Sequence, residues 1–325
     1  MNGTCPDVTV TIVNTNNRRL LEPCLESIFA TWTGRHTMEI IVVDNASSDG
    51  SVEMVQSRFP DVKLICNERR KGFGANHNSA LRISRGRYLL VLNDDTVMLN
   101  DTIEQMIDFG DAHPNAGMIG PKTFNPDGTL QDTCVRFPTI LTQLKQILFQ
   151  RFSSYCVISY PPAVHDTVAD VEWLRGSAMM VRREAMDQVG MLDERFFIFY
   201  EEVDWCYRMR KGGWRNLLCP QAHMIHVGKT TVSGKRNRVM DAQMFLSELL
   251  YFDKHYPYLS GPVWRAFHAG YICLRMVKTW LPGSAEPAEE RAYRRELLRH
   301  LLRLTLNSPK RLLEIGKFPG GFAPS

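Results

Sequence analysis

Short apolar runs alternate with stretches of helical periodicity through the N-terminal part of the chain. The apolar runs predict β-strands at 8–13, 39–43, 62–66 and 88–92, and the stretches between them predict helices at 20–31, 51–58 and 75–84. The strands are almost continuously apolar, which is typical of parallel strands covered by helices on both faces. The pattern therefore predicts an α/β fold with a mostly parallel central sheet.

The periodicity weakens between residues 121 and 169, where Pro126-Asp127-Gly128 is a turn signal and residues 141–149 are amphipathic. We expect a loop-rich insertion in this segment. Regular patterns return at 171–181 and 196–213, and beyond His226 the chain is predicted to be helical and basic.

The net charge of +4 over 325 residues is unevenly distributed. Residues 254–325 hold 12 Lys and Arg against 5 Asp and Glu, a net of +7, so the preceding residues have a net of −3. We expect only the basic end to meet an anionic partner.

The eight cysteines form neither a Cys-x-x-Cys pair nor a zinc-type array, and the chain starts without a basic segment followed by an apolar one. These features predict reduced thiols, no secretory signal and a cytoplasmic location. No apolar run reaches the roughly 18 residues that a transmembrane helix needs.

Polar clusters follow three of the predicted strands, at 14–17, 44–49 and 93–95. Ligands of parallel sheets bind beyond the carboxyl ends of the strands, so these clusters predict the site. Carboxylates there can hold a divalent cation, which a departing diphosphate needs. Asp95 is the preferred ligand, with Asn93 and Asp94 facing the nucleotide or the metal. The alternative is an Asx turn that caps the next segment.

Asp44 ends the second predicted strand, where its carboxylate can accept hydrogen bonds from a base or a ribose. A purely local structural role is equally open. Ser48 or Asp49 is expected to cap the next helix.

A basic and glycine-rich segment runs from Arg69 to Asn78 and leads into a predicted helix. Cations and backbone N–H groups at a helix start suit a phosphate. Gly72-x-Gly74 covers half of a dinucleotide fingerprint, but His77 occupies the place of its third glycine, which argues against a nicotinamide cofactor.

Three acids follow an aromatic run: Glu201, Glu202 and Asp204. Negative charge is favoured in the first turn of a helix, which would account for Glu201 or Asp204. A carboxylate in a partly desolvated pocket is also a suitable general base, for which we favour Glu202 and then Asp204. His226 could add an imidazole to the cation site, or be an ordinary histidine.

Taken in order, these segments resemble the family 2 inverting glycosyltransferases, and among them the bacterial rhamnosyltransferase-like branch. The resemblance covers roughly residues 7–232 and rests on VTIVNTNN, VVDNASSDGS, KGFGANHN leading to LLVLNDDT, and FFIFYEEVDWCYRMRKGGW followed by HMIHVGKTT. It implies a GT-A-type α/β/α sandwich with a mostly parallel central sheet, followed by a C-terminal helical segment.

The resemblance also implies roles by position. Asp95 and His226 would hold Mg²⁺ or Mn²⁺, and Glu202 would be the base, with Asp204 and Glu201 as further catalytic candidates. The donor-binding candidates are Asn14, Asn16, Asp44, Asn45, Lys71, Gly72, Asn76, Asn93 and Asp94.

Three positions depart from the family pattern. Thr15-Asn16 replaces a common Tyr-Asn, and Arg70 replaces the Asn of an Asn-x-Gly-Phe segment. The base position holds Glu202 where an Asp is usual, which lengthens its reach by one methylene.

The activity that the resemblance implies is inverting, metal-dependent transfer of a hexose in cell-surface polysaccharide synthesis. Rhamnose from dTDP-rhamnose is the expected donor sugar, and a hydroxyl of a glycan or lipid-linked acceptor receives it. Residues 1–245 are the expected catalytic domain, with a nucleotide-sugar half over about 1–120 and an acceptor half over about 121–245. Residues 246–325 are the expected basic helical extension.

In this extension, arginines recur every four residues at Arg291, Arg295, Arg299 and Arg303, and apolar residues have helical spacing from Trp264. Such stretches can lie on an anionic membrane surface, or pack on the catalytic domain with a solvated basic face. We expect a protein bound peripherally to the inner face of the plasma membrane, with no nucleic-acid partner.

Two rival functions stay open. A sugar-1-phosphate nucleotidyltransferase would need a glycine-rich phosphate loop with a basic residue after the first strand, where this chain has Asn14-Thr15-Asn16-Asn17. A non-catalytic scaffold would bind a sugar nucleotide without turning it over.

Overall fold

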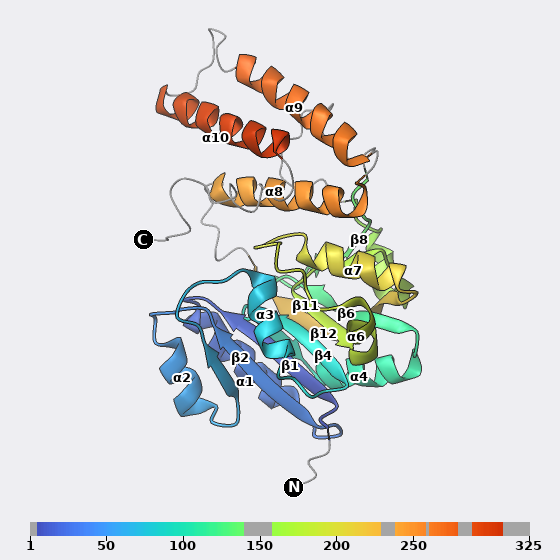
Figure 1. The fold of residues 1–325 in the computed structure, drawn as a ribbon. Coiled ribbons are helices and arrows are strands. Elements are labelled where there is room, and N and C mark those ends of the chain that lie inside the picture. Colours follow the sequence, from blue (N-terminus) through green and yellow to red (C-terminus); the bar gives the residue numbers. More distant parts are fainter. Residues whose placement is uncertain (1–4, 140–157, 229–237, 258–259, 279–287, 308–325) are drawn as a thin grey trace. The chain divides into compact units, whose positions relative to one another are not determined.

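The computed structural model describes residues 5–139, 158–228, 238–257, 260–278 and 288–307 (Figure 1). The amphipathic stretch predicted at 141–149 lies outside these residues. The chain divides into two compact units. The sheet unit contains the described residues up to 137, then 158–197 and 201–228. The helical unit contains residues 138–139, Ile198–Tyr200 and the described residues from 238 onward.

The first half of the sheet is parallel, as predicted, and its strand order is β3-β2-β1-β4. Its elements are β1 (Val8–Asn14), α1 (Arg18–Thr31), β2 (Met38–Asp44), α2 (Ser51–Arg58), β3 (Lys63–Cys66), α3 (Phe73–Leu81) and β4 (Tyr88–Asn93). The predicted helix at 75–84 therefore begins and ends earlier than expected. The register places Asn14 beside Asp44 and Val13 beside Asn93, so the polar clusters meet at one edge.

The second half of the sheet continues from β4 in the order β11-β6-β12-β5 and is mixed. β11 is antiparallel to β4 and β6, β12 is parallel to β6, and β5 is antiparallel to β12. The bounds are β5 (Thr96–Leu99), α4 (Thr102–Ala112), β6 (Ala116–Phe124), β11 (Ala178–Arg182), α6 (Arg183–Val189), α7 (Glu201–Lys211) and β12 (Arg215–His226). Shorter elements are β7 (Leu130–Gln131), β8 (Cys134–Val135), the 3₁₀ helix η1 (Pro162–Asp166), β9 (Ala169–Asp170) and β10 (Trp173–Leu174).

Alternate residues of the central strands pack on opposite faces of the sheet. In β2, Ile40 and Val42 join a core cluster that includes residues of α1 and α4. Ile41 and Val43 pack with Ala80 of α3 on the other face. Both faces of the sheet are therefore covered by helices, which confirms the predicted α/β/α sandwich (Figure 1).

β12 is a long strand that the sequence pattern did not predict. Pro220 interrupts its apolar run, and proline cannot donate a hydrogen bond to a sheet ladder. The register of β12 against β6 shifts between Cys219 and His223, which accommodates the proline in an irregularity of the ladder. Beyond the shift, His226 pairs with Thr96 of β5.

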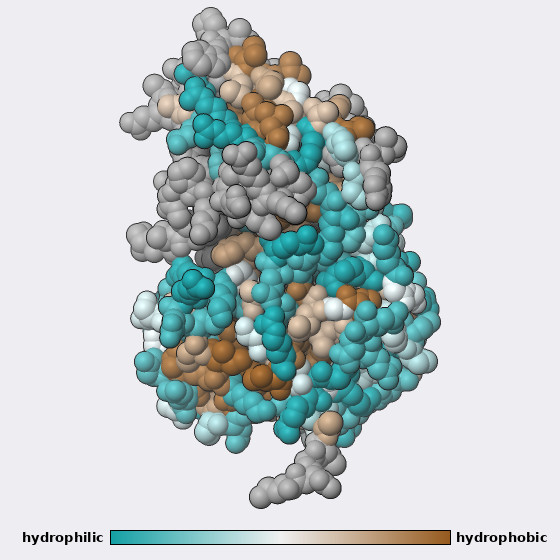
Figure 2. All heavy atoms as spheres, viewed as in Figure 1, coloured by the Kyte–Doolittle hydropathy of each residue, from teal (hydrophilic) through white to brown (hydrophobic). Residues whose placement is uncertain are grey.

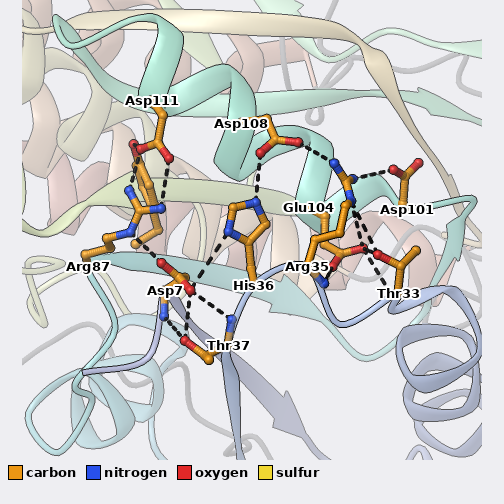
Figure 3. Close-up of polar contacts among 11 residues, drawn as sticks. Asp7, Thr33, Arg35, His36, Thr37, Arg87, Asp101, Glu104, Asp108 and Asp111 are labelled. Atoms are coloured by element: carbon orange, nitrogen blue, oxygen red, sulfur yellow. Dashed lines mark hydrogen bonds and ion pairs between the residues drawn. The ribbon is translucent and has the colours of Figure 1, made fainter. Parts of the chain in front are cut away.

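A charged network closes the sheet at the amino ends of its parallel strands (Figure 3). Arg87 bonds to Asp7 and to both carboxylate oxygens of Asp111, and Asp7 also accepts hydrogen bonds from the backbone and hydroxyl of Thr37. Glu104 of α4 is buried and accepts hydrogen bonds from the segment that leads into β2. The network ties α4 to the starts of β1, β2 and β4, at the edge away from the polar clusters.

The helical unit contains α8 (Arg238–His255), α9 (Ser260–Lys278) and α10 (Ala288–Leu306). Trp264 is almost fully buried, with its ring 5.2 Å from Phe252 of α8 and 3.7 Å from His268. Arg265 of α9 bonds to Asp253 of α8 and to backbone oxygens at the end of α10. Among the described helices, none has the length and apolar character needed to cross a membrane.

Candidate active site

The ends of β1 and β2 form a buried polar cluster. Nδ2 of Asn14 donates to Oδ1 of Asp44 at 3.1 Å and to Oγ of Ser47 at 3.0 Å. The Ser47 N–H donates to Oδ2 of Asp44 at 2.9 Å. Asn14 and Asp44 are buried, and Oδ1 of Asn14 has no hydrogen-bond partner among the described residues. The carboxylate of Asp44 is therefore held in one orientation.

Asn16 and Asn45 hold the neighbouring loops. Oδ1 of Asn16 accepts the Ser48 N–H at 2.7 Å, and Asn16 itself has a positive φ of 51°. Oδ1 of Asn45 accepts the Lys71 N–H at 2.8 Å, and its Nδ2 donates to the Lys71 carbonyl at 3.1 Å. In the described structure both side chains are engaged with backbone, so they hold the loops that follow β1 and β2.

The N-cap of α2 is Gly50, and not Ser48 or Asp49 as was predicted, but Asp49 still bonds to the helix start. Its Oδ1 accepts the Ser51 N–H at the start of α2, and its Oδ2 accepts the Arg18 N–H at the start of α1. One carboxylate thus satisfies a backbone donor at each of two helix starts.

Gly72 allows two loops to approach closely. A Cβ atom at this position would lie 2.5 Å from the carbonyl oxygen of Phe197, and that oxygen accepts the Phe73 N–H at 2.8 Å. The N–H of Phe73 is therefore not available to a phosphate. Nζ of Lys71 donates to Oδ1 of Asn67, and the buried Asn76 donates to the Lys71 carbonyl, so the predicted phosphate contact would come from the Lys71 cation and not from the Phe73 N–H.

Asp95 and His226 meet at the end of β4. Oδ1 of Asp95 lies 3.2 Å from Nε2 of His226, and Nδ2 of Asn93 lies 3.4 Å from the same nitrogen. The convergence follows from the β5–β12 ladder, because His226 pairs with Thr96 and the Val227 N–H donates to the Asp95 carbonyl. Burial would raise the pKa of Asp95, but the adjacent His226 imidazole and nearby backbone N–H groups outweigh it and lower that pKa.

This pair fits a divalent cation. Oδ1 of Asp95 is buried with no conventional hydrogen-bond partner in the described part of the chain, facing the imidazole nitrogen. Neighbouring ligands of an octahedral ion with bonds of ~2.1 Å lie about 3 Å apart, close to this separation. No group of three His, Cys, Asp or Glu side chains within the described ranges is placed to hold a metal. Two protein ligands are still sufficient for an ion that is completed by water and substrate phosphates.

Asp94 lies beside this pair but points toward α1. Its Oδ1 accepts a hydrogen bond from Nδ2 of Asn17 at 3.0 Å. Burial, reinforced by the charge of Asp95, raises the pKa of Asp94 to about 7 despite that bond.

The three acids of α7 have different surroundings. Asp204 is fully buried, and its Oδ2 accepts a hydrogen bond from Nε of Arg208 at 2.8 Å. Arg208 also donates to the carbonyls of Val189, Gly190 and Met191. The contacts of Asp204 therefore favour a structural role, in which it orients the arginine that holds the turn before Leu192.

Glu201 and Glu202 are both buried at the start of α7. Burial and the charge of Glu202 raise the pKa of Glu201 well above its ordinary value. Glu202 packs against Gly176, whose added Cβ would lie 3.6 Å from the Glu202 Cβ. Ser177 follows Gly176 in the chain, and its backbone carbonyl accepts a hydrogen bond from the Asn93 N–H at 3.0 Å. Glu202 thus packs against the residue that precedes the contact of Ser177 with the end of β4.

The backbone before Glu201 is strained. Phe199 and Tyr200 have φ values of 70° and 69°, in the left-handed region that costs a non-glycine residue about 1–3 kcal/mol. Within the helical unit, Oγ of Ser247 donates to the Ile198 carbonyl at 2.9 Å, and the rings of Tyr200 and Tyr251 lie 5.6 Å apart. Such strain persists only where surrounding contacts hold it, and it is common in functional segments.

Gln131 is a residue of this site that the sequence analysis did not select. Its Oε1 lies 2.7 Å from Nδ1 of His226. The only signal nearby was the Pro126-Asp127-Gly128 turn, which brings β7 back along β6. A turn signal does not say which side chain will reach a histidine far away in the sequence.

Comparison with known proteins shows a match to a glycosyltransferase family model. Residues 9–163 match the family model described as Glycosyl transferase family 2. The chain is 27% identical over 220 residues to the N-acetylglucosaminyl-diphospho-decaprenol L-rhamnosyltransferase of Mycobacterium tuberculosis. The aligned region covers 63% of this chain and 72% of that protein.

Solved structures agree on the fold. The structure of GalNAc-T7 with UDP, GalNAc and Mn²⁺ superposes with a TM-score of 0.61 at 14% identity, covering 96% of this chain and 57% of that one. The mannosyltransferase PcManGT of Pyrobaculum calidifontis, in complex with GDP-Man and Mn²⁺, gives a TM-score of 0.52 at 19% identity, with coverages of 96% and 86%. The chain therefore contains a glycosyl transferase family 2 domain built on the GT-A fold.

Proposed function

We propose that this protein is a metal-dependent, inverting glycosyltransferase that moves a sugar from a nucleotide diphosphate donor to an acceptor hydroxyl. The observation that carries the proposal is the approach of Asp95 to His226 at 3.2 Å, beside the cluster formed by Asn14 and Asp44. A bound Mg²⁺ or Mn²⁺ would be held by Asp95 and His226 and would supply neutralising charge to the departing diphosphate.

The donor lies along the carboxyl edge of the parallel strands in this proposal. Asp44, oriented by Asn14 and Ser47, hydrogen-bonds the base or ribose. Asn16, Asn45 and Asn76 support the loops that surround the donor, and Lys71 brings positive charge toward its phosphates. Asn93 and Asp94 complete the donor side next to the cation ligands.

Glu202 is the proposed general base. It takes the proton from the acceptor hydroxyl while that oxygen forms a bond to the anomeric carbon and the bond from this carbon to the diphosphate breaks. Attack from the face opposite the leaving group inverts the anomeric centre. Glu202 is preferred because the Asp204 carboxylate already accepts a hydrogen bond from Arg208. The strongly raised pKa of Glu201 favours its protonated form, which cannot accept a proton as a base does.

The proposed donor is dTDP-rhamnose, and the proposed acceptor is a glycan or lipid-linked hydroxyl in cell-surface polysaccharide synthesis. Support comes from the mycobacterial relative, whose name describes transfer of L-rhamnose to a decaprenol-linked sugar. We assign catalysis to residues 1–245, with donor binding in about 1–120 and acceptor binding in about 121–245, and membrane proximity to residues 246–325.

The helix α9 supports a peripheral membrane contact. It contains three Arg and Lys and no acidic residue, and Val263, Leu274 and Val277 are exposed at helical spacing. Figure 2 shows apolar side chains gathered over this helix. The sequence argument began at Trp264, which is instead buried among the helices. In this proposal the protein is cytoplasmic. A lipid-linked acceptor would bring this surface of α9 to the inner face of the plasma membrane.

Flotation with anionic and neutral liposomes tests the membrane contact. We expect the full-length protein to float with anionic vesicles and Leu274→Asp to float poorly. Leu306→Asp, on an exposed apolar residue of α10, is the matched control that adds the same charge. Sedimentation of the wild-type protein away from anionic vesicles would contradict the proposal.

A panel of nucleotide sugars with Mn²⁺ and a lipid-linked acceptor tests the catalytic proposal. We expect release of nucleoside diphosphate, fastest with dTDP-rhamnose. Calorimetric binding of the nucleotide diphosphate without turnover of any donor would favour a non-catalytic scaffold. Release of pyrophosphate from a nucleoside triphosphate and a sugar 1-phosphate would favour a nucleotidyltransferase.

A further inference from the structure

Gln131 contacts both the ring and the backbone of His226. Oε1 of Gln131 lies 2.7 Å from Nδ1 of the imidazole, and its Nε2 lies 3.3 Å from the His226 carbonyl oxygen. The same Nε2 donates to Oδ1 of Asn125 at 3.0 Å. Asn125 is fixed by the turn, since its N–H and carbonyl bond to Thr129 and Gly128. Three contacts therefore hold one amide against the imidazole.

These contacts determine which amide atom is which. A backbone carbonyl can only accept a hydrogen bond, so the Gln131 atom that faces the His226 carbonyl must be the nitrogen. The oxygen then faces Nδ1, and because it is an acceptor it requires a hydrogen on Nδ1. A neutral imidazole with that hydrogen has its lone pair on Nε2.

The lone pair on Nε2 faces Asp95. Oδ1 of Asp95 is also an acceptor, and the two atoms are 3.2 Å apart. Two acceptors that face each other so closely in a buried site repel unless a cation, either a proton or a metal ion, lies between them. The tautomer that Gln131 selects is the one whose free nitrogen can be a metal ligand.

We propose that Gln131 is a positioning residue for a divalent-cation site at Asp95 and His226. It fixes the Nδ1–H tautomer and the rotation of the ring, so that Nε2 is presented as a ligand. The inference rests on the proposed function, because the metal dependence proposed there makes Nε2 of His226 a metal ligand. The hydrogen-bond partner of a metal-ligating imidazole contributes about 10–100-fold in metal affinity or activity.

Three variants separate this role from general support of the fold. Gln131→Leu removes the acceptor at similar size, and Gln131→Glu keeps an acceptor at the same place. Asn125→Ala removes the side chain that holds Nε2 of Gln131. The readouts are the ring-nitrogen NMR shifts of His226 in the metal-free protein and the affinity for Mn²⁺ in the presence of dTDP.

We expect the Nδ1–H tautomer in the wild-type protein and in Gln131→Glu, with Mn²⁺ affinities within a few-fold of each other. Gln131→Leu should give a mixture of tautomers and bind Mn²⁺ about 10–100-fold more weakly. Asn125→Ala should move both readouts in the same direction by a smaller factor, and it decides the question if the leucine variant does not fold.

The outcomes distinguish the two proposals. Unchanged tautomer and unchanged Mn²⁺ affinity in Gln131→Leu, or in Asn125→Ala if that variant carries the test, would overturn the inference about Gln131. A wild-type protein that binds no Mn²⁺ would overturn the proposed metal dependence, while the tautomer in the metal-free variants would still show whether Gln131 controls the imidazole.

Discussion

Oδ1 of Asp95 and Nε2 of His226 lie 3.2 Å apart, although the two residues are distant in the sequence. They meet because the β5–β12 ladder places His226 opposite Thr96, the residue after Asp95. A single carboxylate or a single histidine would be a weak indication of a cation site. Their juxtaposition at the carboxyl edge of a GT-A sheet is a much more specific indication of a cation site than either residue alone.

Removal of either cation ligand should abolish most of the activity. We expect His226→Ala and Asp95→Ala each to lower turnover by about 10²–10³-fold, since charge stabilisation by a metal contributes several kcal/mol. Mn²⁺ affinity should fall in parallel. His223→Ala, on the same strand, is the control, because His223 bonds to the Pro220 carbonyl instead. Wild-type turnover in both ligand variants would refute the assignment.

Glu202→Gln tests the general base. We expect kcat to fall by about 10³-fold with little change in donor KM, because a general base acts in the chemical step. Glu201→Gln should stay within a few-fold of wild type, since the raised pKa of Glu201 favours a protonated acid that glutamine resembles. A larger loss in Glu201→Gln than in Glu202→Gln would reverse the two roles.

Asp204→Asn should destabilise the protein more than it slows the reaction. The change leaves Arg208 without its carboxylate in a buried setting, where breaking an ion pair costs about 3 kcal/mol. Denaturant unfolding measures the loss, and kcat is measured well below the unfolding transition. A fully stable variant with a kcat reduced as far as in Glu202→Gln would instead make Asp204 catalytic.

Gly72→Ala should disturb the contact between the Lys71–Phe73 loop and Phe197. The new Cβ would lie 2.5 Å from the Phe197 carbonyl oxygen, so the loops must separate and weaken the Phe73 hydrogen bond. We expect a higher donor KM and a lower unfolding midpoint. Gly270→Ala in α9 meets nothing within 4 Å and should be neutral or stabilising by about 1 kcal/mol. Identical behaviour of the two variants would contradict this explanation of Gly72.

The charged network at the amino edge should make stability depend on acid pH. Burial alone would raise the pKa of Asp7, but hydrogen bonds from Thr37 and Arg87 lower it from 3.8 to about 2. A carboxylate with a depressed pKa stabilises the fold above its unfolded pKa, and this contribution is lost as pH falls toward 2. The stability difference between wild type and Asp7→Asn should therefore be constant above about pH 5, shrink as the pH falls, and be lost only below about pH 2.

Urea unfolding midpoints across this pH range measure the effect. Asp187→Asn, at an exposed position, is the control that removes the same charge. A wild-type advantage over Asp7→Asn that persists unchanged to pH 2 would show that the carboxylate is not the source of the stability.

The sequence alone determined the parallel half of the sheet and the edge where its polar residues gather. Alternating apolar runs and helical stretches are local patterns, and the carboxyl ends of parallel strands meet at one edge. Asp44, Asp95 and Glu202 could be selected because each belongs to a polar cluster that follows an apolar segment. The alternation failed at β12, where Pro220 interrupts the run and only the ladder to β6 restores the strand.

The tertiary structure decided which candidate residues share a site and which serve the fold. Strand pairing brings His226 next to Asp95. Asp204 forms an ion pair with Arg208, and the Gln131 side chain contacts the His226 imidazole. The structure also showed that Gly72 is required by the Phe197 carbonyl. These outcomes depend on distances between residues far apart in the chain, and spacing in a sequence carries no information about which distant side chains will meet.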